Sequence, residues 1–393
     1  MSKTISVGID IGTSQVKVVV AESDGAGDRE LPRVIGVGYA ESRGLRHGYI
    51  LNQADALRSI RQAVTQAEKA SGSPIKRVVA SIGGIGLGSI TTTGTVVITK
   101  ADSEVTELDV KNAIEVSREE IPASASMNRK IIHTAPLSYK VDGKFVLGRP
   151  EGLKGSKIEV KTLFITCFER HINDLLETLA EAGIEVEDLV AAPMAASLVT
   201  LSKQQKMAGC VLANIGSETV SIVVFENNMP LSLEIFPIGS NDITNDIALG
   251  LRVPLEEAED IKRGSLVGGN HSRKKIDEIV SARLSDVFEL IEAHLKKLGR
   301  NGLLPAGIIL TGGGSAIEMI EDLAKSSLKL PSRIAHISFG DNIKGQIKDA
   351  SWSVAYGLCI IGLQNGEEES ISGLKLVRKT RNGLVNLFRQ FLP

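Results

Sequence analysis

Small polar residues follow an apolar stretch near the start of the chain, in an arrangement that could bind phosphate. Asp10 ends the stretch, Gly12, Thr13 and Ser14 form the following turn, and Lys17 comes shortly after. Backbone N–H groups, hydroxyls and an ammonium group are the donors that hold a phosphate. Glycine permits close approach of the backbone, and the carboxylate can hold Mg²⁺ through a water. Taken alone, the turn also fits an ordinary hairpin.

A second turn of the same kind follows in a weak internal repeat. The sequence VGIDIGTSQVKVVVA at 7–21 aligns with VLANIGSETVSIVVF at 211–225. Both copies are typical of two β-strands joined by a tight turn, so we predict two related α/β halves whose turns face each other across a cleft and clamp a polyphosphate. The second turn would supply Asn214, Gly216, Ser217, Glu218 and Thr219.

A third loop is rich in glycine. The apolar run at 308–310 breaks into Thr311, Gly312, Gly313, Gly314 and Ser315. A flat ligand, or its α-phosphate, could pack directly on such a backbone. Glycine runs are also common in loops, but three such loops in a duplicated chain favour a nucleotide site.

Several further segments must position these loops. Helices rich in small residues are expected at 193–201 and 350–361, with a polar linker at 202–209 between the halves. Alternating strands at about 86–162, around a helix at 107–120 that Thr106 caps, predict an inserted domain. The segment at about 241–302 predicts a helical insertion, and the acidic stretch at 367–373 predicts a tether.

Composition excludes several classes of protein. The chain has 393 residues, enough for more than one domain. Its net charge of -2 gives no case for nucleic acid as a partner. Cys167, Cys210 and Cys359 lie in apolar runs, which indicates buried thiols in a reducing compartment. The N-terminal sequence lacks the pattern of a signal peptide and no run of about 20 apolar residues occurs, so we expect a cytoplasmic protein.

The order of these segments resembles the superfamily of actin, hexokinase and the heat-shock chaperones. The inserted strand-rich segment narrows the resemblance to the FtsA family of bacterial division proteins, and GSITTTGTVVITKADSEVTELDVKNAI, HTAPLSYKVDG, GLKGSKIEV and PIGSNDITNDIALGL are all similar to it. The resemblance covers essentially the whole chain and implies a duplicated actin-like (ribonuclease-H-like) α/β fold. The implied parts are subdomain 1A (1–85 and 163–201, with 358–366 returning to it), inserted subdomain 1C (86–162), subdomain 2A (209–240 and 303–357), subdomain 2B (241–302), a linker (367–381) and a C-terminal amphipathic helix (382–393).

The resemblance also implies ATP or ADP with Mg²⁺ as the ligand. Glu259 and Lys262 would flank the ribose and base, although without the resemblance they also fit a solvated helix face. The other implied contacts are Asp10, which would also hold Mg²⁺ through water, Gly12, Thr13, Ser14, Lys17, Asn214, Gly216, Ser217, Glu218, Thr219, Gly239, Gly312, Gly313, Gly314 and Ser315.

Two departures from the superfamily pattern weaken hydrolysis more than binding. Asn214 stands where an Asp usually begins the second phosphate loop, and Glu218 adds a negative charge near the expected γ-phosphate. Ala192 stands where a Glu often positions the attacking water, and alanine cannot orient water. We therefore expect turnover to be slow or absent and name no catalytic residue.

The last residues form an amphipathic pattern. At 100° per residue, the apolar side chains of 382–393 cover an arc of about 160°. A polybasic run at 375–381 precedes them, which favours an anchor on anionic lipids over a helix docked on its own protein. The expected membrane-facing residues are Leu384, Val385, Leu387, Phe388, Arg389, Phe391 and Leu392.

The resemblance implies a role at the division site, on the cytoplasmic face of the membrane. Its partners would be the C-terminal peptide of FtsZ through subdomain 2B, other division proteins through subdomain 1C, further copies of the chain in a filament, and anionic lipids. Two alternatives stay open. One is an active ATPase or sugar kinase, although no residue marks a catalytic Asp for a kinase; the other is a pilus-assembly protein resembling the PilM family, which lacks the amphipathic tail.

Overall fold

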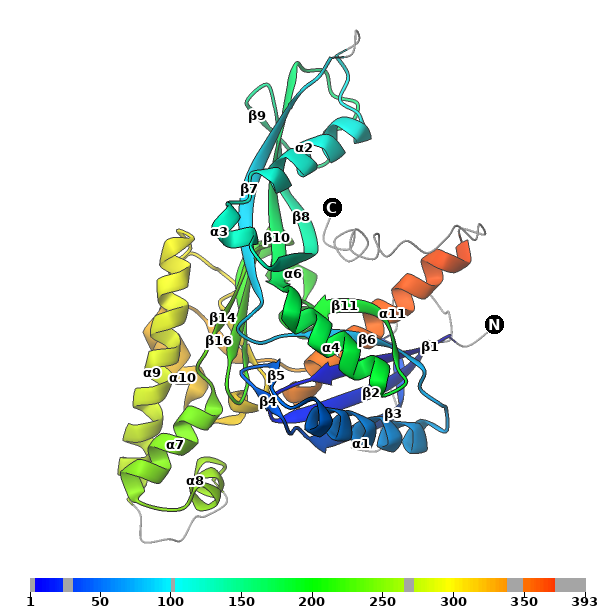
Figure 1. The fold of residues 1–393 in the computed structure, drawn as a ribbon. Coiled ribbons are helices and arrows are strands. Elements are labelled where there is room, and N and C mark those ends of the chain that lie inside the picture. The colour runs from blue at the N-terminus through cyan, green and yellow to red at the C-terminus, as the bar shows by residue number, and fades with distance from the viewer. Residues whose placement is uncertain (1–3, 24–30, 100–102, 265–271, 338–348, 372–393) are drawn as a thin grey trace.

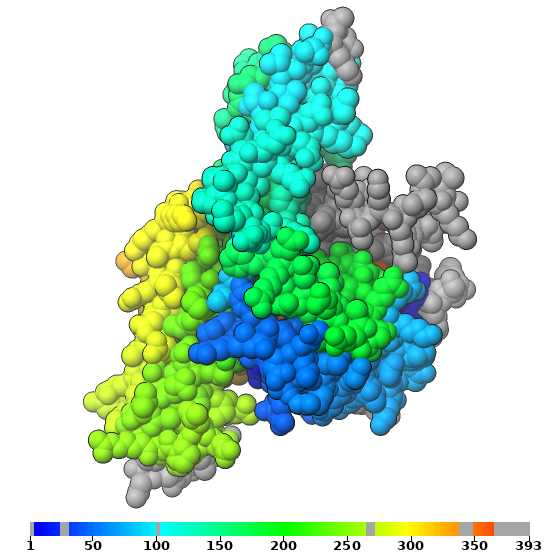
Figure 2. Space-filling view, viewed as in Figure 1, coloured from blue at the N-terminus to red at the C-terminus, as the bar shows by residue number. Residues whose placement is uncertain are grey.

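The structure is a computed structural model that describes residues 4–23, 31–99, 103–264, 272–337 and 349–371. The expected tail helix at 382–393 and most of the expected linker lie outside these residues. Figure 1 shows a body of two lobes and a narrow sheet that projects from it, and the space-filling view in Figure 2 shows how far this sheet stands out.

The first lobe is built on a five-stranded sheet with the order β11-β6-β1-β2-β3. Strands β1 and β2 form the predicted hairpin, β3 extends it antiparallel, and β6 and β11 add parallel strands. Its strands are β1 Thr4–Ile11, β2 Gln15–Ser23, β3 Arg33–Glu41, β6 Arg77–Ile82 and β11 Glu185–Ala191, followed in the same lobe by the short hairpin β4 Leu45–Arg46 and β5 Tyr49–Ile50.

The second lobe repeats this topology. Its sheet has the order β14-β13-β12-β15-β16, with three antiparallel strands followed by two parallel ones. The prediction of two related α/β halves is therefore confirmed. The strands are β12 Cys210–Ile215, β13 Val220–Glu226, β14 Met229–Phe236, β15 Ile308–Thr311 and β16 Ser332–Ile334.

Helices cover both sheets, and one of them joins the lobes. Helices α1 and α4 pack on one face of the first sheet, α5 and α11 on the other, while α7, α9 and α10 cover the outer face of the second sheet. Helix α5 contacts strands of both sheets. The helices of the body are α1 Gln53–Ser71, α4 Glu169–Glu181, α5 Ala192–Thr200, α6 Lys203–Ala208, α7 Ser240–Leu251, α8 Leu255–Lys262, α9 Arg273–Lys297, α10 Ile320–Leu328 and α11 Ser353–Ile371, with 3-10 turns η1 Gly313–Ala316 and η2 Ala350–Trp352.

The projecting sheet is formed by the expected insertion. It has the order β7-β10-β8-β9, with β7 Gly88–Val97, β8 Arg129–Val141, β9 Lys144–Val146 and β10 Lys157–Phe168. Helix α2 Glu107–Glu119 packs on it. Thr106 is the N-cap, as predicted, and its N–H donates a hydrogen bond to the Asp109 carboxylate at 2.9 Å. Helix α3 Ala123–Ser126 is a short addition. Strand β10 runs through the expected boundary at residue 162 into the body.

Two local predictions were wrong. The expected linker at 202–209 contains helix α6, because Ser202 and Gln205 form a capping box at its start and Gly209 ends it with a φ of 101°. Helix α11 continues to Ile371, five residues into the expected linker, because glutamates are good helix formers and nothing in 367–371 breaks the helix.

Two further features are the burial of the cysteines and the capacity of the helices to cross a membrane. Cys167, Cys210 and Cys359 are buried and free, as predicted. None of the helices in the described residues combines the length and the apolar character needed to cross a bilayer.

Candidate functional site

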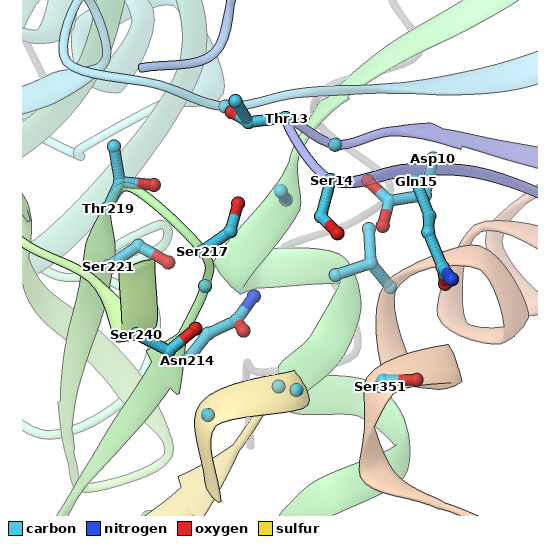
Figure 3. A pocket seen from close by; sticks show the side chains of 18 of the residues that line it. Asp10, Thr13, Ser14, Gln15, Asn214, Ser217, Thr219, Ser221, Ser240 and Ser351 are labelled. Atoms are coloured by element: carbon cyan, nitrogen blue, oxygen red, sulfur yellow. The ribbon is translucent and has the colours of Figure 1, made fainter. Parts of the chain in front are cut away.

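A cavity of about 380 Å³ lies between the two lobes. This volume is within the roughly 300–1,000 Å³ of ordinary small-molecule sites. Figure 3 shows Asp10, Thr13, Ser14 and Gln15 on one side, a group from the second lobe facing them, and Ser351 on a third side. The cavity is therefore a cleft with walls from both halves of the repeat.

The two hairpin turns have the same geometry. In the first, the Gly12 N–H donates to the Gln15 carbonyl at 3.1 Å; in the second, the Gly216 N–H donates to the Thr219 carbonyl at 2.9 Å. Both glycines line the cavity. Each turn thus brings a glycine and a hydroxyl residue to the cleft, as expected of paired phosphate loops.

Most residues that the sequence assigned to a nucleotide lie on this cavity. They are Asp10, Gly12, Thr13, Ser14, Lys17, Asn214, Gly216, Ser217, Thr219, Glu259, Lys262, Gly312, Gly313 and Gly314. Glu218, Gly239 and Ser315 do not line it.

The three exceptions have other roles. The Ser315 hydroxyl donates a hydrogen bond to the Gly312 carbonyl at 2.7 Å and so stabilises the glycine loop without lining the cavity. Gly239 precedes helix α7, and a Cβ there would lie 2.4 Å from the Ser217 carbonyl oxygen, so glycine lets the helix approach the turn. The Glu218 carboxylate accepts a hydrogen bond from the His47 N–H at 2.5 Å, in the other lobe, rather than pointing into the cavity.

Asp10 lies half-buried at the base of the cleft. Its Oδ1 accepts a hydrogen bond from the Ser81 hydroxyl at 2.7 Å. Burial raises the pKa of Asp10, and the Ser81 bond and the charge of Lys17 oppose this rise. A fixed carboxylate of this kind can hold a hydrated divalent cation.

Lys17 does not point freely into the cleft as expected. Its Nζ donates to the carbonyl oxygen of Ser351 at 2.9 Å and to the hydroxyl at 2.6 Å, and lies 5.4 Å from the centre of the Trp352 ring. Burial lowers the pKa of Lys17, while Asp10 and Asp349 raise it. Lys17 therefore ties strand β2 to the turn η2 that precedes helix α11.

Glu259 and Lys262 form a polar cluster at the other end. Glu259 Oε2 accepts from Lys262 Nζ at 2.6 Å and from the Thr244 hydroxyl at 2.6 Å, and its Oε1 accepts from Arg263 Nε at 2.9 Å. Burial raises the pKa of Glu259, but the bonds from Lys262 and Thr244 prevail and leave the pKa below its usual value. Burial also lowers the pKa of Lys262. The cluster presents an ionised carboxylate with fixed orientation.

Sequence reasoning missed several lining residues. A signal for some of them exists, because VVASIGG at 78–84 and IILTGG at 308–313 form a second match between the halves. In this match Ser81 corresponds to Thr311. Thr311 is paired in register with Asn214, and Ala80, the residue before Ser81, is paired with Ile9, the residue before Asp10. The missed residues are Ile11, Gln15, Gly48, Ser81, Gly83, Gly84, Ala192, Ser221, Ile235, Ser240, Asn241, Arg263, Ala316, Ile317, Ser351, Ser353 and Val354, of which Ala192 had been considered only as a departure from the superfamily pattern.

Solved structures share this fold. A "PilM-PilN type IV pilus biogenesis complex" matches with a TM-score of 0.67 and 19% identity, covering 91% of this chain and 98% of that chain. MreB5 of Spiroplasma citri bound to ADP matches with a TM-score of 0.52 and 15% identity, covering 94% and 99%. At these identities the likeness shows the fold alone, and the fold is the expected actin-like one.

Sequence comparisons identify the family. The family model described as "Cell division protein FtsA" matches residues 211–357, and that described as "SHS2 domain inserted in FTSA" matches residues 84–166. Cell division protein FtsA of Pseudomonas aeruginosa is 30% identical over 392 residues, which cover 93% of this chain and 92% of that protein. The chain therefore belongs to the FtsA family of cell division proteins.

Proposed function

We propose that this chain binds ATP or ADP with Mg²⁺ in the cleft between its lobes. The observation that carries the proposal is the pair of equivalent turns, Gly12–Gln15 and Gly216–Thr219, on opposite walls of one cavity. The glycines at 312–314 form a third wall on which a base or ribose can pack. The solved structure of an MreB5 with ADP bound, which shares this fold, supports a nucleotide as the ligand.

Asp10 is the residue best suited to hold Mg²⁺, through water. Among the described residues that line the cavity, the carboxylates are Asp10 and Glu259, and Glu259 is engaged by Lys262, Thr244 and Arg263. Ala192 lies on the cavity wall and cannot orient a water. Slow or absent hydrolysis is therefore part of the proposal.

The division into subdomains 1A, 1C, 2A and 2B with the boundaries given above is also proposed. Each insertion carries exposed apolar side chains that suit protein contacts. In subdomain 2B, Leu249 is 79% and Leu255 58% exposed; in subdomain 1C, Phe145 is 71% and Leu147 100% exposed. Subdomain 2B would bind the FtsZ peptide, and subdomain 1C would contact other division proteins, within filaments of the chain.

We further propose that the segment 382–393 anchors the chain to the cytoplasmic face of the membrane at the division site. The support is the amphipathic pattern and the preceding basic run in the sequence. One short anchor binds weakly, so a filament that carries many anchors would bind by avidity.

The two alternatives have less support. The pilus-assembly reading rests on a shared fold at 19% identity, whereas an FtsA relative is 30% identical over 92% of its length. An active ATPase would need a group to orient water at the position of Ala192. Measured phosphate release separates that reading from slow turnover.

Vesicle co-sedimentation tests the proposal. The full chain is compared with a chain truncated after Gly373, on vesicles that contain anionic lipids, with and without ATP. We expect only the full chain to pellet with vesicles, and ATP to increase the amount. Equal pelleting of both chains, or of neither, would contradict the anchor and favour a tail docked on its own protein.

A further inference from the structure

A second groove lies between a helix of the first lobe and a strand of the second. Its volume is about 390 Å³, and among the described residues it shares none of its lining with the nucleotide cleft. One wall is the end of α5 with the link to α6, residues 198–202, and another is β16 with the residues after it, 333–336. Side chains of consecutive residues point in different directions, so these two runs bring backbone groups to the groove. We call this feature the α5–β16 groove.

Strand β16 offers backbone groups that its sheet does not use. It is the last strand of the second sheet and pairs with β15 on one side. The Ala335 N–H donates to the Leu310 carbonyl at 2.7 Å. Since alternate residues of a strand direct their hydrogen bonds to opposite edges, the N–H and carbonyl of Ile334 point away from β15. An extended chain can add to such an edge.

The end of α5 supplies acceptors, and Gln205 supplies a donor. A helix leaves its last carbonyl groups without partners inside the helix, and no backbone hydrogen bond from another described residue reaches the carbonyls of 198–201. The Gln205 Oε1 accepts from the Ser202 N–H at 2.8 Å. The buried Nε2 of Gln205 has no partner within the described part of the chain. A ligand of the α5–β16 groove can therefore donate and accept hydrogen bonds.

Cations and apolar side chains line the same groove. Arg333 and His336 are exposed, and Arg333 forms no ion pair with another described residue. Leu31 is 44% and Ile334 42% exposed, and Leu198 adds a half-buried apolar side chain. A ligand that matches this lining carries a carboxylate next to an apolar group.

We propose that the α5–β16 groove binds an extended peptide segment of a partner protein in which acidic and apolar residues adjoin. Its N–H groups donate to the carbonyls at the end of α5, and its carbonyls accept from Gln205 and from the Ile334 N–H. An acidic side chain pairs with Arg333, and an apolar one packs on Leu198. A fatty acid has the carboxylate but no N–H to donate, so a peptide fits better. This inference does not depend on a nucleotide in the cleft.

Fluorescence anisotropy on the full chain tests the proposal. The probe is the fluorescein-labelled peptide Glu-Leu-Asp-Val-Glu with an amidated C-terminus. One comparison peptide carries lysine at each acidic position. A second comparison peptide carries a methyl group on the backbone nitrogens of its leucine and valine, so it lacks the donors for the end of α5.

Two variants alter the groove. Arg333→Gln removes its charge, and Lys203→Gln is the matched control, because Lys203 is an exposed cation of α6 that does not line the groove. Gln205→Glu replaces the free donor by a carboxylate that repels an acidic peptide. It keeps the oxygen that accepts from Ser202, since glutamate also serves in a capping box.

We expect the probe to bind the unaltered chain and Lys203→Gln with the same affinity. Arg333→Gln and Gln205→Glu should each bind it about tenfold more weakly, because hydrogen bonds to charged groups contribute that much. The lysine and N-methylated peptides should bind the unaltered chain about tenfold more weakly than the probe. Absence of probe binding to the unaltered chain, or equal binding to all four proteins, would overturn the inference.

Two further outcomes would assign the α5–β16 groove to another occupant. Probe binding to the chain truncated after Gly373, but not to the full chain, would show that the tail fills the groove. Loss of self-association in Arg333→Gln, measured by analytical ultracentrifugation without the probe, would show that a second copy of the chain fills it. Either result would overturn the inference and leave the proposed nucleotide site untouched, since the two cavities are separate.

Discussion

The hydroxyl of Ser81 donates a hydrogen bond to the carboxylate of Asp10 at 2.7 Å, and the same oxygen lies 3.4 Å from the Ile11 N–H. Ser81 therefore ties the end of β6 to both the side chain and the backbone just before the turn that joins β1 and β2. Because Asp10 is half-buried, this bond holds its carboxylate in one orientation at the base of the cleft.

Removal of the Ser81 hydroxyl should weaken Mg²⁺-dependent nucleotide binding. In Ser81→Ala the Asp10 carboxylate loses its partner, and loss of a group that orients a metal-binding residue typically costs 10-fold or more in affinity, so we expect about a tenfold loss. Calorimetric titration with Mg²⁺ and with EDTA measures it. Ser197→Ala, which removes a buried hydroxyl on α5, is the control. An equal loss with Mg²⁺ and with EDTA would contradict a role in holding the ion.

Trp352 should report ligand binding, since it is the single tryptophan of the chain and Lys17 Nζ lies 5.4 Å from its ring. A phosphate in the cleft would draw the ammonium away from Ser351 and from the ring. We expect tryptophan emission to change and saturate as ADP is added, and Lys17→Met to abolish the change and weaken binding by about tenfold. If Lys17→Met showed the same change in tryptophan emission as the unaltered chain, movement of Lys17 could not be the cause of that change.

Acid should destabilise the fold through His133. This side chain is 1% exposed, its Nε2 accepts from the Ala191 N–H at 3.0 Å, and burial lowers its pKa to about 3. The unfolded chain has a histidine pKa of about 6.5, so it binds the proton more readily than the folded chain. The contribution to stability is present above pH 6.5 and is lost as the pH falls toward 3.

Urea unfolding at pH 7 and pH 5 checks this prediction. The single histidine should lower the free energy of unfolding by about 2 kcal/mol between these two values. His133→Gln should show a smaller decrease than the unaltered chain, whatever its stability at pH 7. The same decrease in both proteins would place the acid sensitivity elsewhere; burial also lowers the pKa of His171, which would give a shift of the same sign.

The three cysteines should resist modification in the folded protein. Burial raises the pKa of Cys167, Cys210 and Cys359 to about 12. The thiolate is the reactive form, and at pH 8 it would be about one part in ten thousand. We expect iodoacetamide to label none of them at pH 8 and all three in urea. Rapid labelling of any one without denaturant would contradict the packing described here.

Local sequence patterns predicted the fold well. The hairpin turns, the glycine loop and the repeat are local features, because β-branched runs and glycines specify strands and close turns without reference to distant residues. Helix α6 was missed although its signal, Ser202 followed three residues later by Gln205, is present in the sequence. Helix α11 extends past its predicted end because the acidic residues that are typical of a tether also form helices.

The candidate site was predictable where the repeat, the glycine run or the family resemblance pointed to it. Asn214 and Gly216 were found through their counterparts in the first half, and both line the cavity. Ser351 comes to the cleft only because the chain returns from the second lobe to the first, a long-range event that no local pattern encodes. The partner of Glu218 was likewise unpredictable, since the His47 N–H is 171 residues away in sequence.

The central claim is that a nucleotide occupies the cleft, and Gly313 allows the most direct test. Gly313 lines the cavity, and a Cβ on it would have no atom within 4 Å, so a larger side chain there fills the cavity without straining the fold. The measurement is calorimetric titration of ADP with Mg²⁺ into the unaltered chain, Gly313→Ala and Gly313→Leu. We predict binding to the first two within about threefold of each other and a loss of more than about thirtyfold in Gly313→Leu. Equal binding to all three proteins, or no binding to the unaltered chain, would contradict the account.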